Sequence, residues 1–175
     1  DQVIRPALLW NDQRTVEECK QIEKTIGRDE LMKITCNPAL TGFQLPKILW
    51  LKNHEPENFR RLKSVLLPKD YVRLMLTGEH ITDVSDASGT AWLDVAQRDW
   101  SPDLLKLSGL DVSHMPQLVE GNASGGQLLP YVATDLGLPA GLTVAGGASD
   151  NAASAVGMGV VNAGDGFLSL GTSGV

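Results

Sequence analysis

The sequence predicts an α/β fold, and three observations support this class. Short apolar runs with strand character alternate along the 175 residues with stretches whose apolar side chains recur at helical spacing. Glycine or proline stands at many boundaries between these segments, where it ends or opens a helix. The hydrophobic content of 42% and the charged content of 21% are ordinary for a globular protein.

The first part of the chain is predicted as one strand followed by four helices. Residues 3–9 form an apolar run typical of an edge strand, because Pro6 removes one backbone donor. Apolar side chains at helical spacing then predict helices over residues 14–27, 29–34, 45–53 and 56–64. We expect Asp29 to cap the second of these helices.

The rest of the chain continues the alternation. Strands are predicted at residues 65–68, 142–147 and 166–170, and helices at residues 69–78, 130–137 and 150–159. Small, polar and β-branched side chains are interspersed over residues 80–95, which indicates strand or loop rather than helix. The glycines and proline of residues 137–141 predict a hinge or domain junction.

Charge and composition exclude several classes of protein. The net charge of −6 argues against a nucleic-acid or membrane partner, since either would favour a basic face. No apolar run approaches the roughly 18–20 residues that span a bilayer, and the first residues do not resemble a signal peptide. Cys19 and Cys36 lack metal-ligand spacing, so we expect reduced thiols, no metal site and a cytoplasmic protein. Both ends look cut, and we expect a piece of a longer enzyme.

Residues 146–159, GGASDNAASAVGMG, place one carboxylate, Asp150, between a predicted strand and a helix of small residues. One interpretation is a helix N-cap, a role that aspartate performs well. The other is a general base at the carboxyl end of a strand, where α/β proteins bind ligands. There the helix dipole would favour the ionised form. The small residues that follow would allow a second lobe to approach closely.

Two other stretches have the composition of binding sites. Residues 169–174, SLGTSG, end a predicted strand with backbone N–H groups and two hydroxyls that suit phosphate oxygens, although such turns are also common in hairpins. Trp10 is followed by Asn11, Asp12 and Arg14, which together suit a sugar or polyol. The alternative there is a packed tryptophan beside a surface Asp12–Arg14 pair. Trp50, Trp92 and Trp100 have no such group of polar residues beside them in the sequence and are predicted to lie in the core.

Six motifs in order resemble the FGGY family of carbohydrate kinases along essentially the whole chain. They are WNDQR, PKILWLKNHEPENF, LLPKDYVRLMLTGE, TDVSDASGTAWLDV with RDW, GGASDNAASAVG and SLGTSG. The combination is most similar to the branch of the family that phosphorylates D-xylulose. Gln44 departs from the pattern, because relatives usually carry a small hydroxyl residue there, and this weakens the assignment to one sugar.

The resemblance implies an actin/hexokinase-type ATPase fold of two ribonuclease-H-like lobes, of which this chain is a part. Residues 1–143 would form most of the N-terminal sugar-binding lobe, and residues 144–175 an interlobe helix and the start of the C-terminal nucleotide lobe. The implied activity is ATP-dependent phosphorylation of a pentulose with Mg²⁺, in the cytoplasm. The piece alone is expected to be inactive, and a homodimer is one expectation for the whole protein.

The resemblance also implies roles for particular residues. Asp150 would be the catalytic base, and Asn151, Trp10 and Asp12 would contact or support the sugar. Gly171, Thr172 and Ser173 would form a phosphate loop for ATP.

Three alternatives remain open at this point. The chain could act on ribulose, gluconate or glycerol, or belong to a non-catalytic relative that binds sugar. A serine hydrolase built on Ser149 is disfavoured, because Asn151 stands where the nucleophile elbow needs glycine.

Overall fold

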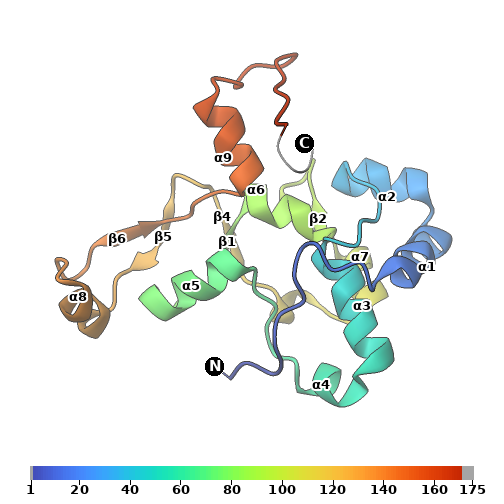
Figure 1. The fold of residues 1–175 in the computed structure, drawn as a ribbon, viewed down its shortest axis with the longest axis horizontal. Helices are drawn as coiled ribbons and strands as arrows, with labels where there is room; N and C mark the ends of the chain where they lie inside the picture. The colour runs from blue at the N-terminus through green and yellow to red at the C-terminus, as the bar shows by residue number, and fades with distance from the viewer. Residues whose placement is uncertain (1, 171–175) are drawn as a thin grey trace.

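The computed structural model describes residues 2–170 as a helical body from which an arm and one further helix project (Figure 1). The α-helices of this part of the chain are α1 (Val16–Ile26), α2 (Arg28–Thr35), α3 (Gln44–His54), α4 (Pro56–Arg61), α5 (Pro68–Thr77), α6 (Val84–Ala87), α7 (Pro102–Ser108), α8 (Pro130–Leu136) and α9 (Asp150–Gly157). Two short 3₁₀ helices, η1 (Ser88–Thr90) and η2 (Val112–His114), lie between them.

The strands of residues 2–170 form three two-stranded sheets. They are β1 (Ile81–Asp83), β2 (Leu93–Asp94), β3 (Asp99–Trp100), β4 (Gln117–Val119), β5 (Ser124–Gln127) and β6 (Thr143–Ala145). β1 pairs in parallel with β4, with Thr82 opposite Leu118. The pairs β2–β3 and β5–β6 are antiparallel, and the second has an irregular register. A parallel pair requires a crossover, which here contains α6, β2, β3 and α7.

The main core lies between α1, α2, α3, α7 and the β2–β3 hairpin. Trp92 and Trp100 are buried in it, as predicted, and each indole N–H has a partner. Trp92 Nε1 donates to Ser108 Oγ at 3.1 Å, and Trp100 Nε1 donates to the Pro116 carbonyl at 3.0 Å. Trp50 is only half-buried and stacks on His54 with ring centroids 5.0 Å apart, so its prediction as core was wrong.

The amphipathic helices follow the predicted ranges closely. The apolar stripe of α1 buries Ile22, and glycines with positive φ end α1, α5 and α8, at +85° for Gly27, +79° for Gly78 and +66° for Gly137. Glycine accepts this backbone conformation without the strain that a Cβ would cause. Gly27 also stands at the N-cap position of α2, so the expectation of an Asp29 cap was wrong.

Four strand-level expectations differ from the structure. Residues 3–9 and 65–68 form no strand, because no neighbouring strand pairs with them within residues 2–170. Residues 166–169 also lack regular structure, and residues 171–174 of that motif lie outside the described part. Residues 80–95 contain the short α6 and η1 as well as strands, because Asp83 caps a helical turn there.

The arm consists of β5, β6 and α8, which extend away from the body together (Figure 1). α9 projects separately, next to α6, and has no buried residue. None of the helices in residues 2–170 has the length and hydropathy needed to cross a bilayer.

Candidate active site

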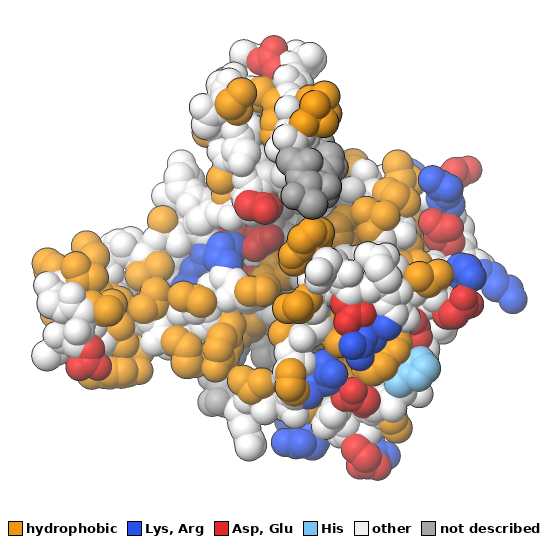
Figure 2. Space-filling model, in the orientation of Figure 1, with side chains coloured by type: hydrophobic (Ala, Val, Ile, Leu, Met, Phe, Trp, Pro, Cys, Tyr) orange, Lys and Arg blue, Asp and Glu red, His pale blue; other side chains and the backbone are white. Residues whose placement is uncertain are grey.

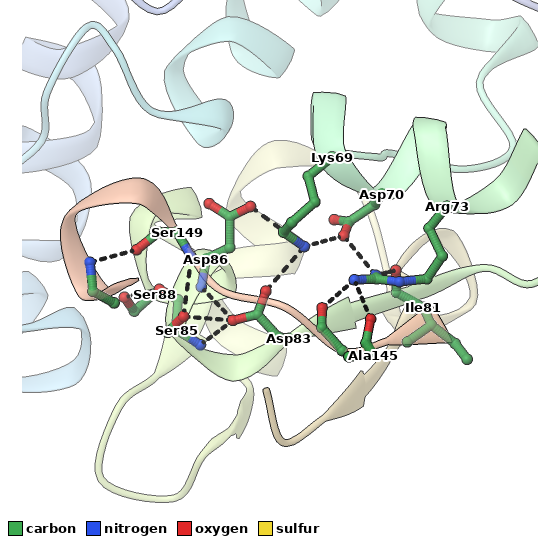
Figure 3. A network of polar contacts seen from close by, with 12 residues as sticks. Lys69, Asp70, Arg73, Ile81, Asp83, Ser85, Asp86, Ser88, Ala145 and Ser149 are labelled. Atoms are coloured by element: carbon green, nitrogen blue, oxygen red, sulfur yellow. Dashed lines mark hydrogen bonds and ion pairs between the residues drawn. The ribbon is translucent and has the colours of Figure 1, made fainter. Parts of the chain in front are cut away.

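Five charged side chains meet where α5 approaches the corner between β1 and α6 (Figure 3). We call Lys69, Asp70, Arg73, Asp83 and Asp86 the charge cluster. The Lys69 ammonium lies 2.5 Å from Asp70 Oδ1, 2.9 Å from Asp83 Oδ2 and 3.5 Å from Asp86 Oδ2. Arg73 Nη1 lies 3.0 Å from Asp70 Oδ1. The side chains of Asp70, Arg73 and Asp83 are 1%, 4% and 0% exposed, so these charges depend on one another rather than on water.

Local sequence rules place these side chains together. Pro68 opens α5, so Lys69 and Asp70 lie in its first turn and Arg73 follows one turn later on the same face. Asp83 ends β1 and is the N-cap of α6. Its Oδ1 accepts hydrogen bonds from two amide groups of that helix at 3.0 and 3.1 Å. The end of β1 and the first turn of α5 therefore place their charged side chains next to one another.

The protonation equilibria of the cluster follow from burial and pairing. Burial lowers the pKa of Lys69, but the hydrogen bonds and charges of Asp70 and Asp83 outweigh it and hold the pKa above its usual value. Burial raises the pKa of Asp83, but hydrogen bonds from Ser85 and Lys69 outweigh it, so the pKa is lowered. For Asp86, burial and the neighbouring carboxylates raise the pKa by more than Lys69 lowers it, so the pKa is raised. Lys69 and Asp83 are therefore charged at neutral pH.

The charge cluster is bonded to the segment that leads into α9. Arg73 Nη2 donates to the carbonyl oxygen of Ala145 at 3.4 Å and also to that of Gly146. On the other side, the Ser149 amide donates to Ser85 Oγ at 3.2 Å. Ser85 is in turn hydrogen-bonded to Asp83 of the cluster at 2.5 Å. Figure 2 shows basic and acidic side chains meeting on the surface at the base of the projecting helix.

The same segment runs tightly against the turn after β4. The amides of Gly146 and Gly147 donate to the carbonyls of Ala123 and Gly121 at 2.8 and 2.9 Å. A Cβ added at Gly146 would lie 2.4 Å from the Glu120 carbonyl oxygen, and one at Gly121 would lie 2.4 Å from that of Gly147. Only glycine fits such a close approach of two backbones. The two glycines of the motif therefore fix the path of the chain into α9.

Asp150 and Asn151 are the first two residues of α9, and both are exposed. The N-cap is Ser149, whose hydroxyl accepts from the Ala152 amide at 3.3 Å, so the interpretation of Asp150 as the N-cap was wrong. Within residues 2–170, the hydrogen bond that Asp150 Oδ1 accepts is a local one, at 2.7 Å, from the Asn151 amide. Within residues 2–170 no ion pair engages this carboxylate, which is open to solvent at the first turn of a helix.

Trp10 and Asp12 lie in the turn that precedes α1. Trp10 is 73% exposed, as a platform for a ligand would be. Both carboxylate oxygens of Asp12 accept from Arg14 Nε at 3.0 Å, and this pairing lowers the pKa of Asp12. The structure thus contains the surface Asp12–Arg14 pair of the alternative interpretation. The Arg14 guanidinium also lies 4.8 Å above the Trp50 ring, which orients it.

The structure brings some of the predicted site residues together and leaves others apart. Asp150 and Asn151 are consecutive in α9, and Trp10 and Asp12 lie two residues apart before α1. Within residues 2–170 no hydrogen bond or ion pair joins the first pair to the second. The predicted phosphate-loop residues Gly171, Thr172 and Ser173 lie outside the described part of the chain.

A groove of about 700 Å³ lies on another part of the molecule and contains none of the predicted site residues. The N-terminal segment, α3, α5 and the chain after α4 line it, with Arg5, Arg61, Lys63 and His80 among apolar side chains. It therefore does not belong to the candidate site.

The charge cluster is what the sequence reasoning missed. Its motifs, LLPKDY and TDVSDASGT, were used only as signs of resemblance, and no residue in them was given a role. The available signal was the spacing of Lys69, Asp70 and Arg73 after a helix-opening proline, which puts three charges on one face of a helix whose other positions are mostly apolar. Charges at such positions are rarely buried unless they are paired.

Comparisons with known proteins identify the family of the chain. Residues 1–157 match the N-terminal domain of the FGGY family of carbohydrate kinases. The chain is 52% identical over 173 residues to the xylulose kinase of Escherichia coli (strain K12) and 45% identical over 174 residues to that of Bacillus subtilis (strain 168). Each alignment covers 99% of this chain and 35% of the relative.

Solved structures give the same result. A crystal structure of a xyloylose kinase from Brucella ovis superposes with a TM-score of 0.93 at 49% identity, over 99% of this chain and 35% of that chain. These likenesses confirm the predicted α/β class and the actin/hexokinase-type ATPase fold. The chain spans about a third of the length of the curated relatives that it matches.

Proposed function

Because the chain belongs to the FGGY family of carbohydrate kinases, we propose that it is the sugar-binding part of an enzyme that transfers phosphate from ATP to D-xylulose. The observation that carries the proposal is Asp150, exposed at the first turn of α9 on a backbone path fixed by glycines and the charge cluster. The identity to xylulose kinases supports the choice of sugar.

In the proposed reaction Asp150 accepts the proton of the ketose 5-hydroxyl. As that proton leaves, the hydroxyl oxygen bonds to the γ-phosphorus of ATP. The bond from this phosphorus to the β,γ-bridging oxygen breaks, and ADP departs with its electron pair. A carboxylate is a weak base, but phosphoryl transfer has a loose transition state in which position matters more than basicity. The products are D-xylulose 5-phosphate and ADP.

The other residues are proposed to orient the two substrates. Asn151 extends from the same helical turn as Asp150 and offers an amide to a sugar hydroxyl. Trp10 offers an exposed ring as a platform, and Asp12, fixed by Arg14, supports that segment. Gly171, Thr172 and Ser173 are proposed to receive the phosphates of ATP.

Mg²⁺ is expected to enter as the partner of ATP. Among residues 2–170, no group of three or more His, Cys, Asp or Glu side chains could hold a metal ion. Lys69 occupies the point between Asp70, Asp83 and Asp86, and its ammonium offsets part of their negative charge.

We also propose the division of the chain into two parts. Residues 1–143 would form most of the sugar-binding lobe, and residues 144–175 the interlobe helix and the start of the nucleotide lobe. The projecting position of α9, without buried residues of its own, supports a helix that a second lobe covers. We expect the whole enzyme to work in the cytoplasm, where ATP is available.

The proposed reaction is tested by an ADP-release assay on the full-length protein with D-xylulose, D-ribulose, gluconate and glycerol. We expect kcat/KM for D-xylulose to exceed that for each other substrate by about tenfold or more, which a site that hydrogen-bonds several hydroxyls can achieve. A preference for another of these substrates would contradict D-xylulose as the substrate but not the proposed kinase activity. Binding of a sugar by calorimetry with no ADP release would instead indicate a non-catalytic relative.

A further inference from the structure

The charge cluster and the start of α9 are connected by hydrogen bonds whose direction is determined. Ser85 has one hydroxyl proton, and Asp83 Oδ1, 2.5 Å away, is a carboxylate oxygen that can only accept it. The Ser85 oxygen is then left with lone pairs directed elsewhere, and one of them accepts the Ser149 amide at 3.2 Å. Lys69, 2.9 Å from the other oxygen of Asp83, favours the ionised carboxylate on which this arrangement depends.

A second connection holds the same segment from the other side. Arg73 is fixed by Asp70 at 3.0 Å and by the Ile81 carbonyl at 2.7 Å, both through Nη1. Its Nη2 is then directed at the carbonyls of Ala145 and Gly146. The buried charges thus hold the chain on both sides of the Gly146–Gly147 turn, three to four residues before the proposed base.

Little else within residues 2–170 holds the first turn of α9. The helix has no buried residue, and within the described part of the chain the Asp150 side chain is hydrogen-bonded only to the neighbouring Asn151 amide. The position of the Asp150 carboxylate is therefore determined by the backbone of Ser149 and by the cap that Ser149 forms with Ala152. A displacement of about 1 Å at a reacting group can cost on the order of 10²-fold in rate.

We propose that the charge cluster positions the catalytic base of this enzyme through Ser85, so that Ser85 and Arg73 are positioning residues for Asp150. The inference rests on the proposed function for its kinetic consequence. Its structural part, that these contacts hold the start of α9 in place, stands independently of that function. Neither Ser85 nor Arg73 needs to touch the sugar or ATP for this role.

The test compares Ser85→Ala, Ser85→Thr and Ser88→Ala in the full-length protein. Ser88 is the matched control, because it is a half-buried serine three residues along whose hydroxyl donates only to the Ser85 carbonyl, at 2.6 Å. We expect Ser85→Ala to lower kcat for D-xylulose by about 10-fold or more with little change in KM, since position is lost rather than binding. Ser85→Thr retains the hydroxyl and should restore most of kcat, and Ser88→Ala should behave as wild type.

Hydrogen exchange of the amides of residues 145–153 gives a second measurement that does not depend on activity. It should accelerate in Ser85→Ala and remain as in wild type in Ser88→Ala. If Ser85→Ala fails to fold, Arg73→Lys replaces it, since it keeps a cation beside Asp70 but loses the second N–H group directed at Ala145 and Gly146.

The outcomes separate the two proposals. Unchanged exchange and an unchanged kcat in Ser85→Ala would overturn the positioning role, whatever the enzyme's substrate. Faster exchange with unchanged kcat would overturn its link to catalysis. Absence of sugar phosphorylation by the wild-type protein would contradict the proposed function, while the exchange data would still decide whether the cluster holds the start of α9.

Discussion

Replacing Asp150 with asparagine in the full-length protein is expected to lower kcat for D-xylulose phosphorylation by about 10²–10⁴-fold. The amide has almost the same shape as the carboxylate and cannot accept the hydroxyl proton, so the chemical step loses its base. Asp150 is exposed and, among residues 2–170, forms only a local hydrogen bond, so the variant should fold normally and bind sugar nearly as well as wild type. Steady-state kinetics and calorimetry of sugar binding measure the two quantities.

Asp135→Asn is the control for this prediction. Asp135 is also an exposed aspartate on a helix, α8, but it lies on the arm and not at the start of α9. Its replacement should leave kcat unchanged. Turnover in Asp150→Asn within about twofold of the Asp135→Asn variant would remove Asp150 from the proposed reaction.

Replacing Lys69 with methionine is expected to destabilise the full-length protein by about 3 kcal/mol, near the lower end for a broken buried ion pair because Lys69 is 27% exposed. The substitution leaves Asp70, Asp83 and Asp86 close together, and Arg73 is then the one cation paired with them within residues 2–170. Methionine fills a similar volume, so the loss would come from charge rather than from a cavity. Urea unfolding followed by fluorescence or circular dichroism measures the change in the free energy of unfolding.

Two further variants identify the source of this effect. Lys24 is an exposed lysine of α1, and Lys24→Met should change the free energy of unfolding by no more than about 0.5 kcal/mol. Adding Asp86→Asn to Lys69→Met should recover part of the loss, because the pKa of Asp86 is already raised by burial and by the neighbouring carboxylates. Equal stability of Lys69→Met and Lys24→Met would show that the cluster does not need its lysine.

The helices were predictable because their signals are local. The stripe that buries Ile22, the proline that opens α4, and the glycines that end α1 and α5 all act within one or two turns of helix. Strands depend on partners elsewhere in the chain, and residues 3–9 have a strand-like sequence but no pairing strand within residues 2–170. The three-residue strand β4 was not predicted for the same reason, since only its pairing with β1 defines it.

The candidate site was predictable to a different extent. Asp150 was identified because glycines, a carboxylate and small residues follow one another directly in the sequence. The N-cap was assigned to the wrong residue, because Ser149 and Asp150 are both good caps and periodicity does not fix a helix boundary to one residue. The charge cluster joins residues 69–73, 83–86 and 145–149, and no local pattern shows that these segments meet.

A crystal structure of the full-length protein with D-xylulose and a non-hydrolysable ATP analogue tests the central claim most directly. The measurement is the distance from the Asp150 carboxylate to the ketose hydroxyl that faces the γ-phosphate. We predict a hydrogen bond of about 2.6–3.2 Å, with the α9 start held by Ser85 and Arg73 as in Figure 3. A bound ketose whose reacting hydroxyl is out of reach of Asp150, or is paired with another base, would contradict the account.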